Sequence, residues 1–514
     1  MADPLRVLTS PVRVTGGLSL AQLVTLVSAD AVLGHARAAG RTVEWIAGVL
    51  TGDLASQLAV ERELAREGLD RAALGRDDFV DRARAIEEAD RIAATEMLGR
   101  LGIDLDLASG ALDADAVAVA ARTAFVRLYE AGLLTRGERV VNTCPRCATV
   151  VDDVDAAAGT ATADAYTVRL PLATGATLDV EVTAVELLGG AVAVAVPPGN
   201  VPLDAVEIPT TGRAVPVITD EDRAEAAFVT PAHDGADLEL ARRHGLAPIM
   251  VLDGAGTVVE PGPLEGQGRY AARATAIDLL AAEGAIGTAR TVEESVLRCR
   301  RCGTVLVPRL GRHWFLPMAD LEVLAADAVR QDVVSVLPPP WSDELVAAAG
   351  QRGDWCLSHQ VWAGQPVPVA TCLDCGQAAV SVEPAGSCGK CMGTLVPDDD
   401  VLDARFVGAV WPLALAGWPA DEDGPALLAP TTVLLVAPTG LVLWAVRMAA
   451  LGLRLCGAAP FACVTVHPAV DPFMYLEGVP EGGGPDDTAV HDALVTAGLD
   501  LDWAAATAAA ILAR

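Results

Sequence analysis

The spacing of hydrophobic residues divides the chain into helical and β-rich stretches. Residues 53–100, which begin DLASQLAVERELAREGL, repeat apolar positions with a helical period and alternate Glu with Arg, so they predict helix. Residues 115–134 predict a second amphipathic helix. Short apolar runs alternate with these helices over residues 1–140, which is typical of an α/β unit.

Residues 160–295 show a β pattern instead. Period-two runs separated by Pro and Gly turns predict strands at YTVRLPL, TLDVEVTAVELL, AVAVAVPP and AVPVIT. One helix, ADLELARRHG, interrupts them. Residues 401–514 return to an α/β pattern and end in an Ala-rich helix.

The most apolar stretch is 433–446, VLLVAPTGLVLWAV. It is shorter than the ~20 residues of a membrane span, and Pro438 and Gly440 interrupt it. We predict a buried strand, a turn and the start of a core helix. The first residues lack the pattern of a signal peptide, so we expect a cytoplasmic protein without a membrane partner.

Composition and charge limit the possible functions. Of 514 residues, 52% are hydrophobic, which is enough for a large core. The net charge of −31 opposes nucleic-acid binding outside a local basic patch. Lys390 is the only lysine, so a mechanism that needs a lysine elsewhere is excluded.

Eight of the 11 cysteines form four Cys-x-x-Cys pairs, which in a long acidic chain favour structural zinc. The last two pairs lie close together and predict one complete site. The first two pairs bracket the β-rich block, and if they share one ion, zinc clips together the two ends of an inserted domain. The alternatives are empty pairs or free thiols. The predicted ligands are Cys144, Cys147, Cys299 and Cys302 for one site and Cys372, Cys375, Cys388 and Cys391 for the other.

These patterns divide the chain into four parts. We expect the first half of an α/β domain at 1–147, a β-rich insertion at 148–298, a zinc-knuckle and connecting region at 299–400, and the second half of the α/β domain at 401–514.

Several segments resemble class I aminoacyl-tRNA synthetases, most closely the valyl-tRNA synthetases. They include FVRLYEAGLLTRGERVVNTCPRC (125–147), TPAHDGADLELARRHGL (230–246), DWCLSHQVWAGQPVPV (354–369), LVLWAVRMAALGL (441–453) and PFACVTVH (460–467). The resemblance implies an α/β fold: a Rossmann-type catalytic domain split by a β-barrel editing insertion, with zinc knuckles. It also implies activation of valine with ATP and transfer to tRNA.

The sequence departs from the family at the residues that bind ATP. The family's His-x-Gly-His turn aligns with Ser19, Leu20, Ala21 and Gln22. The Asp-His of its Pro-Gly-Thr-Asp-His-Ala-Gly segment aligns with Leu50 and Thr51. Its Gly-Tyr-Asp aligns with Ala437, Pro438 and Thr439, and its lysine loop with 468–487, which holds no basic residue. Loss of one preorganised donor costs ~10²–10³ in rate, so we do not expect ATP to be used.

Other aligned positions are candidate ligand-cleft residues. Arg405 stands where the family has Trp, and His359 where it has Arg, so either could replace lost contacts. With Ser19, Gln22 and Trp444 they form our set of cleft candidates. In the insertion, Asp237 matches the family's editing aspartate, whereas the arginine strand aligns with Thr183, Ala184, Val185 and Glu186.

Three functions follow from this resemblance. We favour a binding or scaffold protein that has lost aminoacylation, with a small-molecule or protein partner. The alternatives are an adenylating enzyme with a rewired ATP site and a trans-editing hydrolase of mischarged tRNA. The chain ends where the family's anticodon-binding domain begins, so we expect neither that domain nor tRNA as a partner. A model can discriminate between the first two, because adenylation needs Arg side chains near Ser19–Gln22 and Pro472–Pro480.

Overall fold

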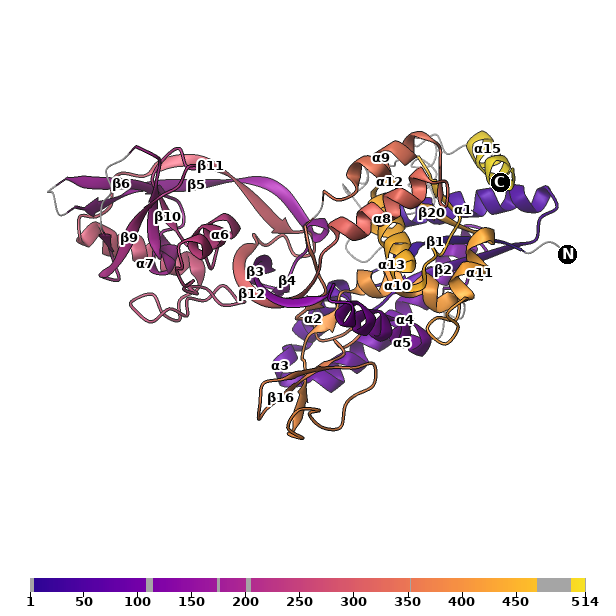
Figure 1. The fold of residues 1–514 in the computed structure, drawn as a ribbon, viewed down its shortest axis with the longest axis horizontal. Coiled ribbons are helices and arrows are strands. Elements are labelled where there is room, and N and C mark those ends of the chain that lie inside the picture. Colours follow the sequence, from indigo (N-terminus) through magenta and orange to yellow (C-terminus); the bar gives the residue numbers. More distant parts are fainter. Residues whose placement is uncertain are drawn as a thin grey trace. The chain divides into compact units, whose positions relative to one another are not determined.

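The computed structural model describes residues 4–107, 114–172, 176–199, 205–351, 353–468 and 501–513. The chain folds as two compact units. Unit 1 comprises Met1–Thr135 and Trp314–Arg514, and unit 2 comprises Arg136–His313. Figure 1 shows the elements of each unit.

A five-stranded parallel sheet forms the centre of unit 1. Its order is β13-β21-β20-β1-β2, and Leu8 of β1 pairs with Ile46 of β2 and Leu434 of β20. All residues of β20 and β21 are buried, as expected for strands covered on both faces. The strands are β1 (Leu5–Arg13), β2 (Val43–Leu50), β13 (Ser335–Leu337), β20 (Thr432–Val436) and β21 (Cys463–Val466).

The strand order creates a topological switch point between β1 and β20. After β1 the chain passes through α1 (Leu20–Ala38) to β2 on one side, whereas β20 lies on the other side of β1. In parallel sheets of this kind, ligands bind beyond the carboxyl ends of the strands at such a point. The residues after β1, β2 and β20 are therefore the first place to look for a site.

The predicted helix over 53–100 is interrupted. Gly68 ends the first segment with φ 74°, and Gly75 precedes the last with φ 86°, a conformation that glycine adopts without strain. The helical prediction is confirmed, but the glycines divide the stretch into three helices: α2 (Leu54–Glu67), α3 (Arg71–Leu74) and α4 (Arg76–Arg100).

The remaining helices of unit 1 pack on the sheet and on each other. The predicted helix over 115–134 is α5, and the Ala-rich helix near the end of the sequence is α15, which packs on α1. Their bounds are α5 (Ala114–Glu130), α8 (Ala319–Arg330), α9 (Pro340–Ala348), α10 (Ala404–Leu415), α11 (Gly424–Leu428), α12 (Pro438–Gly440), α13 (Arg447–Cys456) and α15 (Leu501–Leu512).

The stretch 433–446 forms the predicted strand, turn and helix. After β20 the helix starts at Pro438, widens to a π-helix over Leu441–Val446 and continues as α13. By length and composition alone, Pro438–Cys456 could cross a membrane, but 61% of it is buried inside the protein. It contributes Trp444, Val446 and Leu451 to the main core, as a core helix does.

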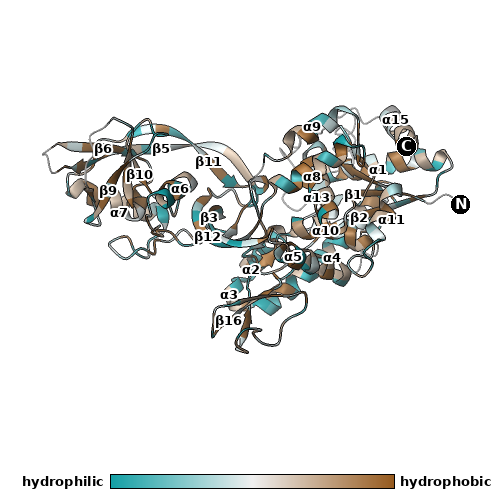
Figure 2. Cartoon of the chain, viewed as in Figure 1, coloured by the Kyte–Doolittle hydropathy of each residue, from teal (hydrophilic) through white to brown (hydrophobic). Residues whose placement is uncertain are grey.

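Figure 2 shows the hydropathy of the other helices: hydrophobic residues, in brown, concentrate on α10, and hydrophilic residues, in teal, recur along α4.

Short strands complete unit 1. The second cysteine-rich segment folds as a three-stranded sheet in the order β17-β16-β18, visible beside the label β16 in Figure 1. Phe315 and Leu316, at the end of β12, pair with β14. The bounds are β12 (Val307–Leu316), β14 (Trp355–Cys356), β15 (Ser358–His359), β16 (Val369–Cys372), β17 (Ala378–Val380), β18 (Leu395–Pro397) and β19 (Val401–Leu402).

Unit 2 is mostly β, as the pattern over 160–295 predicts. It contains a sheet in the order β11-β5-β6 and a sheet in the order β10-β7-β9-β8, which enclose a core that includes Val168, Val194 and Ile208. Helices α6 (Gly235–Arg243) and α7 (Arg269–Ala282) pack on them. The strands are β3 (Thr135–Cys144), β4 (Thr149–Val150), β5 (Ala156–Pro171), β6 (Thr177–Val182), β7 (Ala193–Val196), β8 (Ala205–Ile208), β9 (Arg213–Thr219), β10 (Ala227–Val229) and β11 (Arg290–Cys299).

The structure of unit 2 differs from the sequence-based expectations in two places. Residues Val185–Gly190, which we expected to continue a strand, form a 3-10 helix. Among the residues that the structure describes, the sheets are open, and none closes on itself as a barrel does.

Candidate metal centres and ligand cleft

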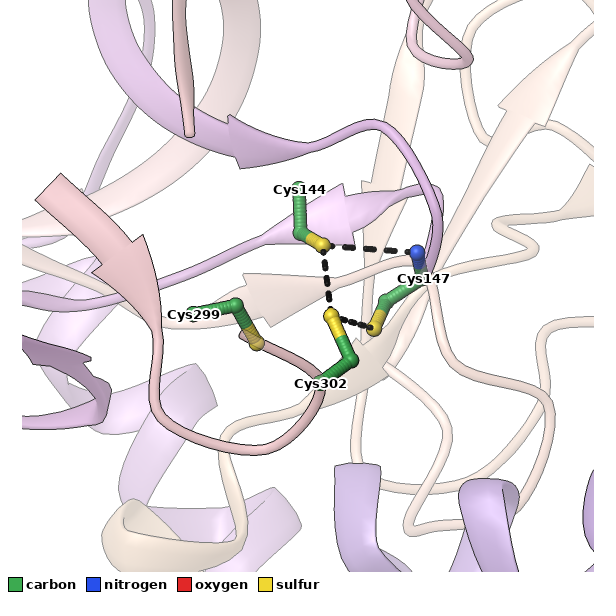
Figure 3. Close-up of side chains that lie close together, drawn as sticks. All are labelled: Cys144, Cys147, Cys299 and Cys302. Carbon is green, nitrogen blue, oxygen red and sulfur yellow. Dashed lines mark hydrogen bonds between the residues drawn. The ribbon is translucent and has the colours of Figure 1, made fainter. Parts of the chain in front are cut away.

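The first two cysteine pairs meet in unit 2. Cys144 ends β3 and Cys299 ends β11, and each strand is followed by a tight turn that carries the second cysteine of its pair (Figure 3). The Sγ atom of Cys302 lies 3.4 Å from that of Cys144 and 3.6 Å from that of Cys147. A disulfide would bring two sulfurs to about 2.05 Å, so these are thiols around a common centre.

The other two pairs meet in unit 1. The Sγ atoms of Cys372 and Cys391 are 3.5 Å apart, and those of Cys375 and Cys388 are 3.7 Å apart. In both groups, four sulfurs lie within 4.8 Å of one another. A tetrahedral zinc with Zn–S bonds of about 2.3 Å has S···S edges of about 3.8 Å, so both groups fit this ion.

All four turns have the same backbone conformation. The residue four positions after the first cysteine has a positive φ, and its N–H donates to that cysteine's carbonyl oxygen at 2.8–3.0 Å. Two of these positions are glycine, but Ala148 (φ 52°) and Met392 (φ 63°) are not. A non-glycine residue costs roughly 1–2 kcal/mol in this region, so the turn is retained against its local preference. The four residues are Ala148, Gly303, Gly376 and Met392.

The crowded thiols favour a cation. Hydrogen bonds from Cys144 and Cys147 lower the pKa of Cys299 to about 2, whereas the hydrogen bond with Cys144 raises the pKa of Cys147. In the second group, backbone N–H donors from Cys391 and Lys390 lower the pKa of Cys388 to about 6. One thiol in each group is thus held as a thiolate, which is the form that binds metal.

At the carboxyl end of β1, the positions aligned with the family's His-x-Gly-His turn serve to cap a helix. Ser19 is the N-cap of α1: its hydroxyl accepts from the Gln22 N–H, and the Ser19 N–H donates to Oε1 of Gln22 at 2.9 Å. The Gln22 amide nitrogen also donates to the Arg13 carbonyl at 3.0 Å. Both side chains therefore complete a capping box, which satisfies the N–H groups of Ser19 and Gln22 from within the chain.

Carboxylates from α4 bind the loops that follow β1 and β2. Oδ2 of Asp90 accepts the Gly16 N–H at 2.9 Å, and Oε1 of Glu87 accepts the Gly52 N–H at 2.7 Å. The guanidinium of Arg13, the last residue of β1, pairs with Asp53. The ends of both strands are thus lined by acidic groups rather than by the cations that would hold a triphosphate.

The other side of the switch point is closed by packing. Trp444 is 7% exposed, and its ring lies so near Gly408 that a Cβ there would be 3.0 Å from Cζ3. At the end of β21, Nε2 of buried His467 lies 2.8 Å from the Thr25 hydroxyl of α1. Burial lowers the pKa of His467 to about 4, so it is neutral at pH 7. Pro472–Pro480 and the aligned lysine loop lie outside the described residues.

Arg405 and His359 both lie beside Asp403. Asp403 caps α10, accepts the Trp355 indole N–H at 2.8 Å, and lies 3.3 Å from Nε of Arg405 and 3.7 Å from Nε2 of His359. Burial alone would raise the pKa of Asp403, but the charge of Arg405 and the hydrogen bond with His359 hold it well below its usual range. Arg447 stacks 3.7 Å over the Trp355 ring. The two candidate replacements therefore belong to a buried charge cluster.

Unit 1 also contains a cavity of about 750 Å³. The end of β2 and α10 form an apolar wall with Leu50, Val407 and Trp411, and α4 contributes polar residues that include Glu87 and Arg91. None of the five cleft candidates is among the residues that line it. Sequence reasoning missed Glu87, although α4 carries a signal: Glu87 lies on the helical stripe of the buried Phe79, Ala83 and Ala94, where an apolar residue is expected.

In unit 2, the editing candidate Asp237 is 3% exposed and already bound. Its Oδ2 accepts the Thr230 N–H at 2.7 Å, and its Oδ1 accepts from Arg223. Burial raises the pKa of Asp237, although the hydrogen bonds from Thr230 and Arg223 lower it in part. Glu186, on the segment aligned with the family's arginine strand, is fully buried and accepts two hydrogen bonds of 2.7 Å from Arg273. A smaller hollow of about 280 Å³ lies beside Thr183, Leu187 and Thr230.

Comparison with known proteins agrees with the resemblance. Residues 3–388 match the family model described as tRNA synthetases class I (I, L, M and V). The chain is 32% identical over 91% of its length to a valine–tRNA ligase of Desulfotalea psychrophila, and 33% identical over 90% to that of Carboxydothermus hydrogenoformans. It covers 54% and 55% of those proteins, so it spans about half the length of the curated relatives it matches. Among solved structures, it is similar to the LeuRS of Agrobacterium radiobacter K84, with 14% identity and a TM-score of 0.47 over 96% of this chain and 68% of that chain.

Proposed function

The chain belongs to the class I tRNA synthetases, and from this membership we propose that it is a valyl-tRNA synthetase-like binding protein that does not activate amino acids with ATP. Its ligand is a small organic molecule held in the cavity of unit 1. A protein partner would bind the surface outside this cavity.

The observation that carries this proposal is the acidic lining of the switch point. Phosphates bind at helix N-termini and loops because free N–H groups point at them. Here the Gly16 and Gly52 N–H groups donate to carboxylates of α4, and Ser19 and Gln22 satisfy each other's N–H groups at the N-terminus of α1.

Repulsion adds to this loss of donors. Two like unit charges 4 Å apart repel by about 4 kcal/mol at an effective dielectric constant near 20. Asp90 and Glu87 contact the loops that follow β1 and β2, and Asp53 already neutralises Arg13. Rate enhancement in phosphoryl transfer comes mainly from cations and donors placed against the developing charge, so their replacement by carboxylates opposes the reaction.

Amino-acid-dependent ATP–pyrophosphate exchange tests the proposal. Purified, zinc-loaded protein is assayed with each standard amino acid, beside an active valine–tRNA ligase. We expect exchange at background level. Exchange above background with any amino acid would overturn the proposal and favour the adenylating enzyme with a rewired site. A flat result together with hydrolysis of mischarged tRNA would favour the trans-editing hydrolase, although both carboxylate oxygens of Asp237 are already engaged.

We further propose that both cysteine groups hold structural zinc. With four thiolates in each group, the ion would have no open position for substrate, so its role is to fix the turns that carry the ligands. The same proposal includes the four-part domain division, a cytoplasmic location and the lack of a tRNA partner.

A further inference from the structure

The two cysteine groups differ in how far solvent reaches their side chains. Three of the four cysteines of the first group are buried, and Cys302 is half-buried. The second group also has two buried cysteines, but Cys391 is exposed. Cys391 is therefore the ligand that a dissolved reagent meets first.

The segment that carries Cys391 has little packing of its own. Within 383–394, all of which the structure describes, only Cys388 is buried and no residue belongs to a helix or strand. A Cβ added at Gly386 or Gly389 would meet no atom within 4 Å. The turns of the first group instead adjoin buried residues such as Thr143 and Val150. A segment with so few buried contacts can move by the small distance that a new bond between two sulfurs requires.

A second sulfur lies beside Cys391. Sγ of Cys372, the last residue of β16, is 3.5 Å from Sγ of Cys391, and a disulfide would bring the two to about 2.05 Å. Zinc holds its cysteine ligands as thiolates, which is the reactive form of the side chain. An accessible thiolate with another sulfur in reach is the arrangement that reversible oxidation to a disulfide needs.

We propose that Cys391 is a peroxide-reactive site whose oxidation releases the metal of the second group, while the first group keeps its own. The Cys391 thiolate attacks hydrogen peroxide, so that an S–O bond forms, the O–O bond breaks and hydroxide leaves. The Cys372 thiolate then attacks the Cys391 sulfur, so that the S–S bond forms, the S–O bond breaks and a second hydroxide leaves. The two sulfurs are oxidised and the peroxide is reduced. Only Cys375 and Cys388 are left as ligands, too few for a structural zinc site.

Zinc release measures this reaction, which rests on the proposed zinc in the second group. The zinc-loaded full chain is treated with hydrogen peroxide, and the released ion is followed with a chelating dye. We expect about one zinc ion per chain to leave at least about tenfold faster than the other, because only one group has an exposed ligand. A dithiol with added zinc should restore the lost ion. Release of both ions at equal rates, or no release, would overturn the inference.

Peptide mapping identifies the sulfurs that react. Trypsin cuts after Lys390, the only lysine, so the peptide that begins at Cys391 stays attached to the segment with Cys372 only through a disulfide. We expect mass spectrometry to find this linked pair and to find the four thiols of the first group unmodified. A disulfide in the first group at the time of fast release would contradict the proposal.

A ligand exchange assigns the reaction to one side chain. Cys391→His keeps a zinc ligand but removes the sulfur, and three cysteines with one histidine form a known type of structural site. We expect it to hold about two zinc ions and to lose the fast release. Cys302→His makes the same exchange in the first group and should release zinc as the unmodified chain does. Fast release from zinc-loaded Cys391→His would overturn the role of Cys391, and if that variant loses its zinc, the peptide map of the unmodified chain still decides.

The inference and the proposals before it fail separately. A second group without zinc would refute both the zinc site and its reaction with peroxide. Zinc that stays bound in the second group under peroxide would refute only the reaction. Neither result affects the pyrophosphate exchange assay, which tests the lack of amino-acid activation.

Discussion

Asp90 and Gly16 are 74 positions apart, yet the carboxylate of the first accepts the backbone N–H of the second at 2.9 Å. Through this bond α4 occupies a donor at the carboxyl end of β1, where parallel α/β sheets bind anions. The same helix places Glu87 against Gly52 at the end of β2.

This contact predicts the effect of removing one charge. Asp90→Asn keeps an acceptor for the Gly16 N–H but removes a negative charge from the mouth of the crevice. We expect the affinity for inorganic pyrophosphate, measured by calorimetry at low salt, to rise about fivefold or more, which corresponds to about 1 kcal/mol. Asp81→Asn, at an exposed position of the same helix, should have no such effect. Equal affinities in the two variants would show that the carboxylate does not repel phosphate.

Metal analysis checks the two cysteine groups. We expect about two zinc ions per chain, because both groups have the geometry of a tetrahedral site. Cys144→Ala and Cys372→Ala should each reduce the count to about one, whereas Cys456→Ala, outside both groups, should leave two. A count of two in Cys144→Ala would mean that the first group is not a zinc site.

The shared turn conformation predicts opposite effects at equivalent positions. Gly303→Ala and Gly376→Ala add a side chain where φ is positive, and we expect each to lower the free energy of unfolding by about 1 kcal/mol, although neither Cβ would touch another atom. Ala148→Gly and Met392→Gly relieve the same strain and should be neutral or stabilising. Urea unfolding of the zinc-loaded variants measures these differences. A destabilisation of Ala148→Gly equal to that of Gly303→Ala would contradict the strain argument.

Buried His467 predicts a dependence of stability on pH. Its pKa is about 4 in the folded chain and near 6.5 when exposed, so between these values only the unfolded chain binds the proton. The contribution of His467 is therefore complete above pH 6.5 and is lost as the pH falls towards 4, by about 3 kcal/mol in all.

We expect the stability difference between the unmodified chain and His467→Asn to shrink by about 2.5 kcal/mol from pH 7.5 to pH 4.5, as measured by urea unfolding. His35→Asn, in the last turn of α1, provides the control at a half-buried histidine. A difference that stays constant with pH would show that His467 has the same pKa in the folded and unfolded chain.

The sequence was sufficient for features that depend on local chemistry. Cysteine spacing predicts the second metal group, and the two flanking pairs around a β block predict that Cys144 and Cys299 come together, as they do. Apolar periodicity predicts β20 and the core helix after it. The break at Gly68 was readable too, because a glycine that follows a run of charged helix residues is a common helix end.

Features that depend on tertiary contacts were not predictable. Nothing near Ser19 in the sequence shows that Asp90 closes the adjacent loop, since the two segments meet only after α4 folds back over the sheet. Arg405 and His359 were interpreted as cleft residues from their aligned positions, but both lie beside buried Asp403. The conformation of Val185–Gly190 also depends on its surroundings. The apolar run TLDVEVTAVELL predicts a strand that continues through it, whereas Glu186 binds Arg273 and the segment forms a 3-10 helix.

The first cysteine group has a consequence for the unfolded chain. The sulfurs of Cys144 and Cys302, 158 positions apart, lie 3.4 Å from each other, so a zinc ion between them closes a loop that contains most of unit 2. For a covalent cross-link of this length, the lost chain entropy corresponds to about 5 kcal/mol at 25 °C. A metal-bound chain would begin folding with the two ends of the β block already joined. The block can then search for its own strand pairings as a closed ring, with its ends held in register by a single ion.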